Sequence, residues 1–142
     1  MLVDANILLY SVDESSPFHE DAGAWMRDAL NGNRRVGLPW LSLSAFLRIA
    51  TNPRASSNPL SPAEAWDIIE GWLDAPASWT PQPGRGHREI LRRLMIDKDL
   101  RAGLVTDAVL AAICIEHGLD IVSADSDFSR FSELNWINPV AR

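Results

Sequence analysis

The fold of this chain is constrained most by short apolar strand patterns that end in an acid. Helical stretches separate these patterns. Residues 1–3 form an apolar run followed directly by Asp4, and Ile121-Val122 forms the apolar centre of a second strand pattern followed closely by Asp125. Asp107 stands instead where an alanine-rich helical pattern opens. Strand ends and helix starts of this kind meet at the carboxyl edge of a parallel sheet. The sequence therefore predicts that Asp4, Asp107 and Asp125 lie close together.

Strand and helix patterns alternate along the whole chain. Strands are predicted at 1–3, 35–38, 78–80, 120–123 and 135–138. Helices are predicted after Asp4, from a cap at 15–17 to residue 30, and at 41–51, 62–73, 87–98 and 107–118. Such alternation is typical of an α/β sandwich in which helices cover both faces of a mostly parallel sheet. We expect one domain that spans residues 1–142.

Composition excludes several classes of protein. The single cysteine, Cys114, rules out a disulfide framework, and its apolar neighbours predict a buried thiol. The chain has no apolar stretch long enough to span a bilayer and no signal-peptide pattern, so we expect a cytoplasmic protein without membrane contact. A net charge of −6 argues against indiscriminate nucleic-acid binding but leaves room for a local basic groove.

Clustered carboxylates need a cation to stay ionised, because negative charges at short distance raise the pKa of each carboxyl group. Oxygen ligands suit Mg²⁺, for which Mn²⁺ can substitute, whereas one cysteine and three scattered histidines do not fit a zinc site. An ion held in this way favours phosphodiester hydrolysis. The candidate catalytic and metal-binding acids are Asp4, Asp107 and Asp125, and the candidate supporting residues are Asn6, Thr106 and Ser123.

Most of these acids also have a structural explanation when each is taken singly. Asp107 would favour the positive end of a helix dipole, and Asp125 and Asp127 would suit a turn that caps the next short helix. Asp4 is different, because an acid that directly follows a buried strand gains little stability unless something binds it. Asp4 is therefore the strongest single indication of a functional site.

A cluster of basic residues follows the predicted loop at 81–86. Arg85, Arg88 and Arg92 would share one face of the next helix if that helix extends far enough. One hypothesis is that these arginines hold the phosphates of a nucleic-acid substrate beside the acidic site. The alternative is an ordinary solvated helix face.

Three motifs, in this order, resemble the PIN-domain ribonucleases and, within them, the VapC toxins of bacterial toxin–antitoxin pairs. They are Val3-Asp4-Ala5-Asn6, Thr106-Asp107-Ala108 and Ser123-Ala124-Asp125-Ser126-Asp127-Phe128. The stretch from Leu38-Pro39-Trp40 through residues 46–53 is similar to a mycobacterial-type subgroup. The resemblance implies a PIN-like three-layer α/β/α sandwich. It also implies that Asp4, Asp107 and Asp125 are metal-site acids, with Asp127 as a supporting metal-site carboxylate.

The same resemblance implies a function and partners. A VapC-type protein would be a metal-dependent endoribonuclease that cuts a structured RNA such as tRNA or rRNA and inhibits translation. It would pair with a VapB-type antitoxin and form a homodimer, with higher-order toxin–antitoxin assemblies as a further expectation. The region around Trp66 and Trp72 has more large apolar side chains than one buried stripe needs. This excess indicates either additional core or a groove for an antitoxin helix.

One position departs from the family pattern. PIN domains usually carry a glutamate just before a hydrophobic pair and an arginine, whereas here Ala45 precedes Phe46-Leu47-Arg48. The change puts a second metal ion, or the usual acid quartet, in doubt unless Glu20 or another acid replaces the glutamate. The alternative function is therefore a catalytically impaired PIN-fold binding module that acts through protein or RNA contacts. Haloacid-dehalogenase chemistry fits less well, because it needs a second aspartate where Asn6 stands.

Overall fold

The computed structural model describes residues 1–141, so the last residue of the domain expected over 1–142 lies outside the described residues. The strands are β1 (Leu2–Val3), β2 (Val36–Gly37), β3 (Ser78–Trp79), β4 (Ile121–Val122) and β5 (Trp136–Ile137). The helices are α1 (Ala5–Val12), α2 (His19–Leu30), α3 (Trp40–Ala50), α4 (Pro62–Asp74), α5 (His87–Asp97), α6 (Leu104–His117) and the short 3-10 helix η1 (Ser126–Arg130). None of the helices in residues 1–141 is long and apolar enough to cross a membrane.

The strands form one parallel sheet in the order β3-β2-β1-β4-β5. The central pair is β1 and β4, in which Leu2 lies opposite Ile121 and Val3 opposite Val122. Because all the described strands run in the same direction, their carboxyl ends lie along one edge of the sheet. That edge is where ligands bind in open α/β sheets.

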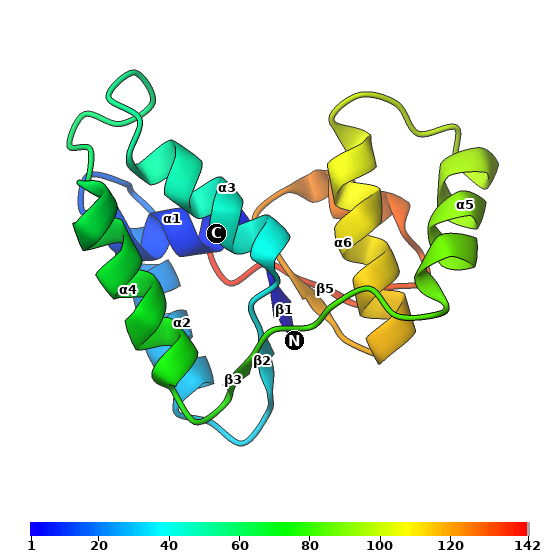
Figure 1. The fold of residues 1–142 in the computed structure, drawn as a ribbon, viewed down its shortest axis with the longest axis horizontal. Coiled ribbons are helices and arrows are strands. Elements are labelled where there is room, and N and C mark those ends of the chain that lie inside the picture. The colour runs from blue at the N-terminus through cyan, green and yellow to red at the C-terminus, as the bar shows by residue number, and fades with distance from the viewer. Residues whose placement is uncertain (142) are drawn as a thin grey trace.

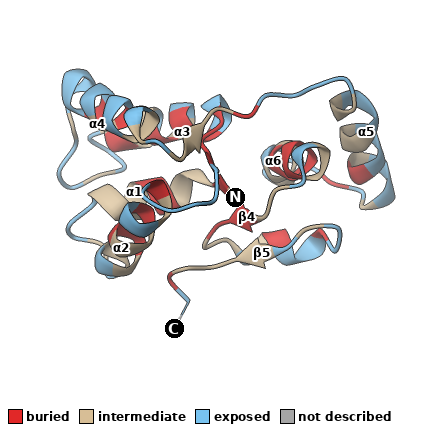
Figure 2. Cartoon of the chain, turned by 90° about the horizontal axis from the view of Figure 1, so that it is seen from below, coloured by how far each residue is buried: buried red, intermediate tan, exposed pale blue. Residues whose placement is uncertain are grey.

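Helices cover both faces of the sheet (Figure 1). Val3 and Val122 face a core shared with α1 to α4, whereas Leu2 and Ile121 face a core shared with α5, α6 and η1. Neighbouring residues in a strand point to opposite faces, so two short apolar strands contribute to both cores. Figure 2 shows α6 largely buried and α5, outside it, largely exposed. The predicted three-layer α/β/α sandwich is confirmed.

Helix α2 begins later than the sequence predicts. The Ser-Ser-Pro pattern at 15–17 predicts a helix cap, but the first helical residue is His19. The Ser16 hydroxyl accepts a hydrogen bond from the backbone N–H of Phe18 at 3.1 Å. The serine therefore closes a turn before the helix, a role for which serine is suited as well as it is for a helix cap.

Gly118 ends α6 in a left-handed conformation, with a φ angle of +67°. A β-carbon would meet no atom within 4 Å there, so a side chain would cost only conformational energy, about 1 kcal/mol. We expect Gly118→Ala to lower the free energy of unfolding by that amount in chemical denaturation. The control is Gly71→Ala, because Gly71 lies inside α4 with equally open surroundings and alanine favours a helix by ~1 kcal/mol. Equal stability of the two variants would contradict this explanation.

Candidate active site

Asp4 and Ser123 meet because β1 and β4 are adjacent parallel strands. Val3 lies opposite Val122, so the next residues, Asp4 and Ser123, leave the sheet side by side at its carboxyl edge. The backbone N–H of Asp4 donates to the carbonyl oxygen of Val122 at 2.9 Å, which fixes this register. The Ser123 hydroxyl then donates to Oδ2 of Asp4 at 2.7 Å.

Asn6 and Ser123 join the two strand ends in one hydrogen-bond network. The Asn6 amide nitrogen donates to Ser123 Oγ at 3.1 Å and to Asp4 Oδ2 at 3.3 Å. Its amide oxygen accepts from the backbone N–H of Ala124 at 3.2 Å. Ser123 Oγ also accepts from the backbone N–H of Asp125 at 3.0 Å. Asn6 and Ser123 therefore contact the acids that they are predicted to support.

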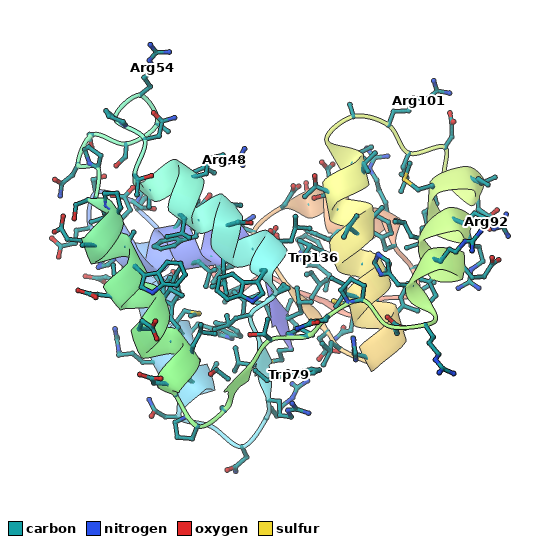
Figure 3. The ribbon with its side chains drawn as sticks, in the orientation of Figure 1. Arg48, Arg54, Trp79, Arg92, Arg101 and Trp136 are labelled. Carbon is teal, nitrogen blue, oxygen red and sulfur yellow. The ribbon has the colours of Figure 1, made fainter. Side chains whose placement is uncertain are left out.

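Trp136 holds the same strand end from β5. Its indole Nε1 donates to the carbonyl oxygen of Ser123 at 2.8 Å. Figure 3 shows Trp136 at the centre of the molecule, between the two groups of helices. The sequence does not single out this residue, because the contact joins positions 13 residues apart and depends on the pairing of β4 with β5.

Asp107, Asp125 and Asp127 form a compact acidic cluster. Each contributes one carboxylate oxygen, and these oxygens lie within 4.8 Å of one another. Asp107 stands in the first turn of α6, which begins at Leu104 and not at the acid itself. Asp125 caps η1, and its Oδ1 accepts from the backbone N–H of Asp127 at 2.9 Å. Asp125 thus combines the turn-capping role with a place in the cluster.

Asp4 shares the electrostatic environment of the cluster. Burial raises the pKa of Asp4, hydrogen bonds from Ser123 and Ala5 lower it, and the negative charge of Asp125 raises it again. Burial also raises the pKa of Asp107 to about 6, with further contributions from the charges of Asp125, Asp4 and Asp127. The structure thus brings three of the predicted acids, Asp107, Asp125 and Asp127, into one cluster, and places Asp4 close enough to interact with it electrostatically.

The ligand atoms of the cluster fit a hard divalent cation. Within residues 1–141 the cluster contains carboxylates and neither histidine nor cysteine, and carboxylate oxygens are the ligands that Mg²⁺ and Mn²⁺ prefer. Arg130 lies 3.8 Å from Asp127, but both side chains are about half exposed and their ion pair is therefore weak. The remaining repulsion between the acids is of the kind that a bound cation relieves.

The raised pKa of Asp107 predicts a pH-dependent stability of the metal-free protein. Folding raises this pKa from 3.8 to about 6. The protonated form of Asp107 therefore stabilises the folded protein fully below pH 3.8, and this stabilisation is lost as the pH rises through 6. In thermal unfolding with a chelator, Asp107→Asn should therefore have the higher Tm above pH 6, and the difference should shrink as the pH falls toward 4. Asp74→Asn, on an exposed end of α4, is the control. A difference that does not change with pH would contradict the assignment.

No glutamate completes the acidic cluster in the described residues. Ala45 lies half-buried on α3, the helix that follows β2. Glu20 is exposed on α2 and does not belong to the cluster. Thr106 is exposed beside Asp107 in the first turn of α6. The candidate site thus consists of four aspartates with their supporting network.

The predicted basic cluster lies away from the acids. Helix α5 begins at His87, so Arg85 lies outside the helix face that Arg88 and Arg92 occupy. The backbone N–H groups on either side of Arg85 donate to Glu116 at 2.7 Å each, at the end of α6 opposite Asp107. Arg92 pairs with Glu89 at 2.6 Å, and Figure 3 shows Arg92 on the outer side of α5.

The tryptophans near α4 divide into core and surface. Trp72 packs edge-on against Phe46, with ring centroids 4.9 Å apart, and belongs to the core around α3 and α4. Trp66 is 44% exposed and stacks on Trp40, which is 45% exposed, with centroids 6.2 Å apart. The additional-core interpretation therefore holds for Trp72 and not for Trp66.

Known proteins with similar sequences cover almost the whole chain. A family model of the PIN domain matches residues 1–134. Ribonuclease VapC37 of Mycobacterium tuberculosis (strain ATCC 25618 / H37Rv) is 41% identical over 140 residues, which cover 99% of this chain and 97% of that protein. Ribonuclease VapC33 of the same strain is 39% identical over 140 residues, with 99% and 98% of the two chains covered.

Solved structures share the fold at low sequence identity. VapBC2 from Rickettsia felis, bound to a DNA fragment from their promoter, matches with a TM-score of 0.67 and 14% identity over 96% of each chain. VapBC-1 from nontypeable Haemophilus influenzae matches with a TM-score of 0.67 and 14% identity over 99% of this chain and 98% of the other. The fold, the family model and the full-length relatives together show that this chain belongs to the PIN-domain family and, within it, to the VapC family.

Proposed function

We propose that this protein is a metal-dependent endoribonuclease and the toxin of a type II toxin–antitoxin system. The observation that carries the proposal is the cluster of Asp107, Asp125 and Asp127, with Asp4 in the same electrostatic environment, at the carboxyl edge of the sheet. Its relatives are named as VapC ribonucleases. The substrate is a structured RNA such as tRNA or rRNA, and its cleavage in the cytoplasm inhibits translation.

The acids fit Mg²⁺, with Mn²⁺ as a substitute, and Asp4, Asp107, Asp125 and Asp127 are the residues that would hold it. When bound, the ion would neutralise the acids, polarise a phosphoryl oxygen and make a water molecule a better nucleophile. The position usually held by glutamate is Ala45, so the proposal rests on these aspartates alone.

The chain itself orients the acids. Oδ1 of Asp4 accepts from the backbone N–H of Ala5 at 2.8 Å, while Oδ2 accepts from Ser123 and Asn6. A carboxylate held at both oxygens has little freedom to rotate, so the site needs little reorganisation when RNA arrives. The positive end of the α6 dipole favours the ionised form of Asp107 and partly offsets the repulsion from the other acids.

The decisive experiment incubates the purified protein, free of antitoxin, with total cellular RNA and Mg²⁺ or Mn²⁺, and maps new RNA ends by sequencing. Discrete cuts that disappear with a chelator and in Asp4→Asn would support the proposal and identify the substrate. Asp13→Asn is a matched control, because Asp13 is an exposed acid at the other end of α1. Without cuts from the folded protein with metal present, the catalytically impaired binding module would become the better explanation, with Ala45 as its cause.

The arginines on α5 remain a proposed RNA-binding surface. Arg88 and Arg92 are exposed, and an RNA that passes the acids would reach them and Arg85 only by extending along α6. We expect Arg88→Gln combined with Arg92→Gln to weaken RNA binding and to reduce its salt dependence, because fewer counterions are released. Binding titrations at several salt concentrations test this prediction. Unchanged affinity and an unchanged salt slope would remove these residues from the interface.

The proposed partners follow from the relatives. Both solved structures named above are VapBC complexes, and one of them is bound to a DNA fragment from their promoter. We propose that this chain likewise pairs with a VapB-type antitoxin, forms a homodimer and enters higher-order toxin–antitoxin assemblies. Light scattering of the isolated chain and of the complex tests these states, and an isolated chain that stays monomeric at all concentrations would contradict the homodimer.

A further inference from the structure

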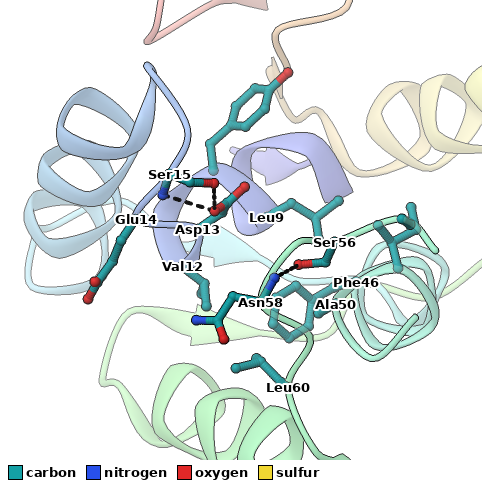
Figure 4. Close-up of a pocket in the computed structure, with 13 residues that line it drawn as sticks. Leu9, Val12, Asp13, Glu14, Ser15, Phe46, Ala50, Ser56, Asn58 and Leu60 are labelled. Atoms are coloured by element: carbon teal, nitrogen blue, oxygen red, sulfur yellow. Dashed lines mark hydrogen bonds between the residues drawn. The ribbon is translucent and has the colours of Figure 1, made fainter. Parts of the chain in front are cut away.

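Helix α3 carries an exposed strip that ends at Arg48. Trp40, Ser44 and Arg48 follow one another at intervals of four residues, and all of them are exposed. Residues four apart share one face of a helix, so these side chains form a single strip along α3. An apolar cavity on another side of the helix is lined by Phe46 and Ile49 but not by Arg48 (Figure 4). The Arg48 side chain is therefore available to solvent.

The strip begins at the carboxyl edge of the sheet. Strand β2 pairs with β1, so α3, which follows β2, begins beside Asp4. Side chains of a helix lean toward its N-terminus, and the long side chain of Arg48 therefore leans back toward this edge. Figure 3 shows Arg48 on the side of α3 toward α6, whose first turn contains Asp107. Arg48 thus approaches the acidic site from the side opposite to α5.

The guanidinium group of Arg48 has no salt bridge or hydrogen bond to any of residues 1–141. Other arginines differ in this respect. Arg130, beside the acidic cluster, already lies 3.8 Å from Asp127, and Arg92 on α5 pairs with Glu89 at 2.6 Å. Arg48 is therefore a free positive charge near the acids.

Ala45 leaves this charge free. It lies three residues before Arg48 on the same side of α3 and is half-buried. A glutamate at this position, as in the usual family pattern, would be placed to pair with Arg48 in the way that Glu89 pairs with Arg92, three residues later on α5. The alanine thus removes one acid from this side of the site and keeps the positive charge available for a ligand.

We propose that Arg48 binds a phosphate of the RNA strand that enters the acidic site. This inference rests on the proposed nuclease function and adds a residue that holds the substrate there. The carboxylates of Asp4 and the acidic cluster carry more negative charge than one divalent ion neutralises, so an approaching RNA is repelled. An exposed arginine offsets this repulsion, and its planar guanidinium group can donate two parallel hydrogen bonds to one phosphate.

The experiment measures the binding of a fluorescently labelled, single-stranded RNA of mixed sequence with Mg²⁺ present. All proteins carry Asp4→Asn, so that the RNA stays intact. Arg48→Gln should weaken binding by about tenfold at low salt, the effect of a lost charged hydrogen bond. The slope of log affinity against log salt should become shallower by about 0.7, the contribution of one phosphate contact on a single strand.

Two further variants make the result specific. Arg48→Lys should keep the salt slope and recover part of the affinity, because lysine keeps the charge but lacks the planar fork. Arg54→Gln is the matched control, since Arg54 is exposed, forms no salt bridge within the described residues and points outward from the loop beyond α3 in Figure 3. It should bind RNA as the parent protein does, and an equal loss in Arg54→Gln and Arg48→Gln would overturn the specific role of Arg48.

Ala45→Glu tests whether the alanine keeps the charge free. The new carboxylate should pair with Arg48 and weaken RNA binding by at least about twofold. Because this carboxylate also repels RNA directly, its effect is compared with its effect in the Arg48→Gln protein, where it should be about twofold smaller. An equal effect in both backgrounds would overturn the link between Ala45 and Arg48.

Cleavage kinetics with an intact Asp4 separate binding from chemistry. Arg48→Gln should raise KM by about tenfold and leave kcat nearly unchanged, because the contact is made before the reaction begins. A loss of kcat with wild-type KM and wild-type RNA affinity would overturn the binding role.

The possible failures can be distinguished. Unchanged RNA affinity and salt slope in Arg48→Gln, while the wild type cuts RNA, would overturn the assignment of Arg48 and leave the nuclease function intact. If Arg48→Gln loses RNA affinity but the wild type cuts no RNA, Arg48 is an RNA-binding residue and the proposed nuclease activity fails. Weaker binding of a copurified antitoxin with unchanged RNA affinity would make Arg48 a protein contact and overturn the inference. A wild type that binds no RNA would overturn both proposals.

Discussion

Asp107→Asn should lower the rate of metal-dependent RNA cleavage by about 10³-fold or more. Asparagine preserves the size of the side chain but removes the negative charge and half of the acceptor capacity. Asp107 is close enough to Asp125 and Asp127 to share one ion with them. The substitution should therefore lower the affinity for the metal ion as well as change the geometry of the site. Single-turnover cleavage of the mapped RNA, with metal in excess, measures this effect.

A change on the surface controls for unrelated effects of the substitution. Asp74→Asn has the same chemistry at an exposed position and should keep full activity. The metal-free Asp107→Asn protein should also be at least as stable as the wild type at neutral pH, because the substitution removes an acid whose pKa is raised by burial and by neighbouring acids. A folded variant that keeps wild-type cleavage would be incompatible with a metal-binding role, and a variant that is unfolded at neutral pH would contradict the stability argument.

Ser123→Ala should lower the cleavage rate by about 10- to 100-fold, the size of effect typical of residues that orient metal ligands. The hydroxyl contacts the Asp4 carboxylate, the Asn6 amide and the backbone N–H of Asp125, so its removal leaves both strand ends less well fixed. Ser123 is fully buried, and the groups left without a partner should also lower the free energy of unfolding by about 1–3 kcal/mol.

A metal titration separates positioning from simple loss of stability. Ser123→Ala should bind Mn²⁺ more weakly at a temperature at which the variant is fully folded, whereas a purely structural role would leave the affinity for the ion unchanged. Ser129→Ala, at an exposed position on η1, should behave as the wild type does in both measurements. Equal Mn²⁺ affinity in Ser123→Ala and the wild type would reduce this residue to a role in stability.

The strand ends at Asp4 and Asp125 could be predicted because a short apolar run followed by an acid is a local pattern. The parallel sheet then places such residues on one edge, and Ser123 joins Asp4 at the distance of a hydrogen bond. Cys114 could be assigned to the core for the same reason, since its apolar neighbours lie next to it in the chain. Local patterns of this kind are enough to predict the fold class and most of the candidate site.

Other features depend on contacts between distant segments. The start of α2 differs from the prediction because Ser16 caps a turn instead of the helix, and both roles use the same hydroxyl. The bond from Trp136 to Ser123 needs the β4–β5 register, and the place of Arg85 follows from the bonds of Gly84 and Gly86 to Glu116. An apolar cavity of about 670 Å³ is lined by α1, α3 and the segments that follow each of them, so no single segment of the sequence could have predicted it.

The chemistry of the RNA ends tests the central claim most directly. If the four aspartates hold a divalent ion that activates water, cleavage should leave a 5′-phosphate on one fragment and a 3′-hydroxyl on the other, and only with Mg²⁺ or Mn²⁺ present. Ligation-based sequencing with and without end treatment distinguishes these ends from 2′,3′-cyclic phosphates. Ends of the predicted type that vanish with a chelator would support hydrolysis at the acidic cluster. Cyclic phosphate ends, or cuts that persist without metal, would contradict it, because the RNA's own 2′-hydroxyl would then be the nucleophile.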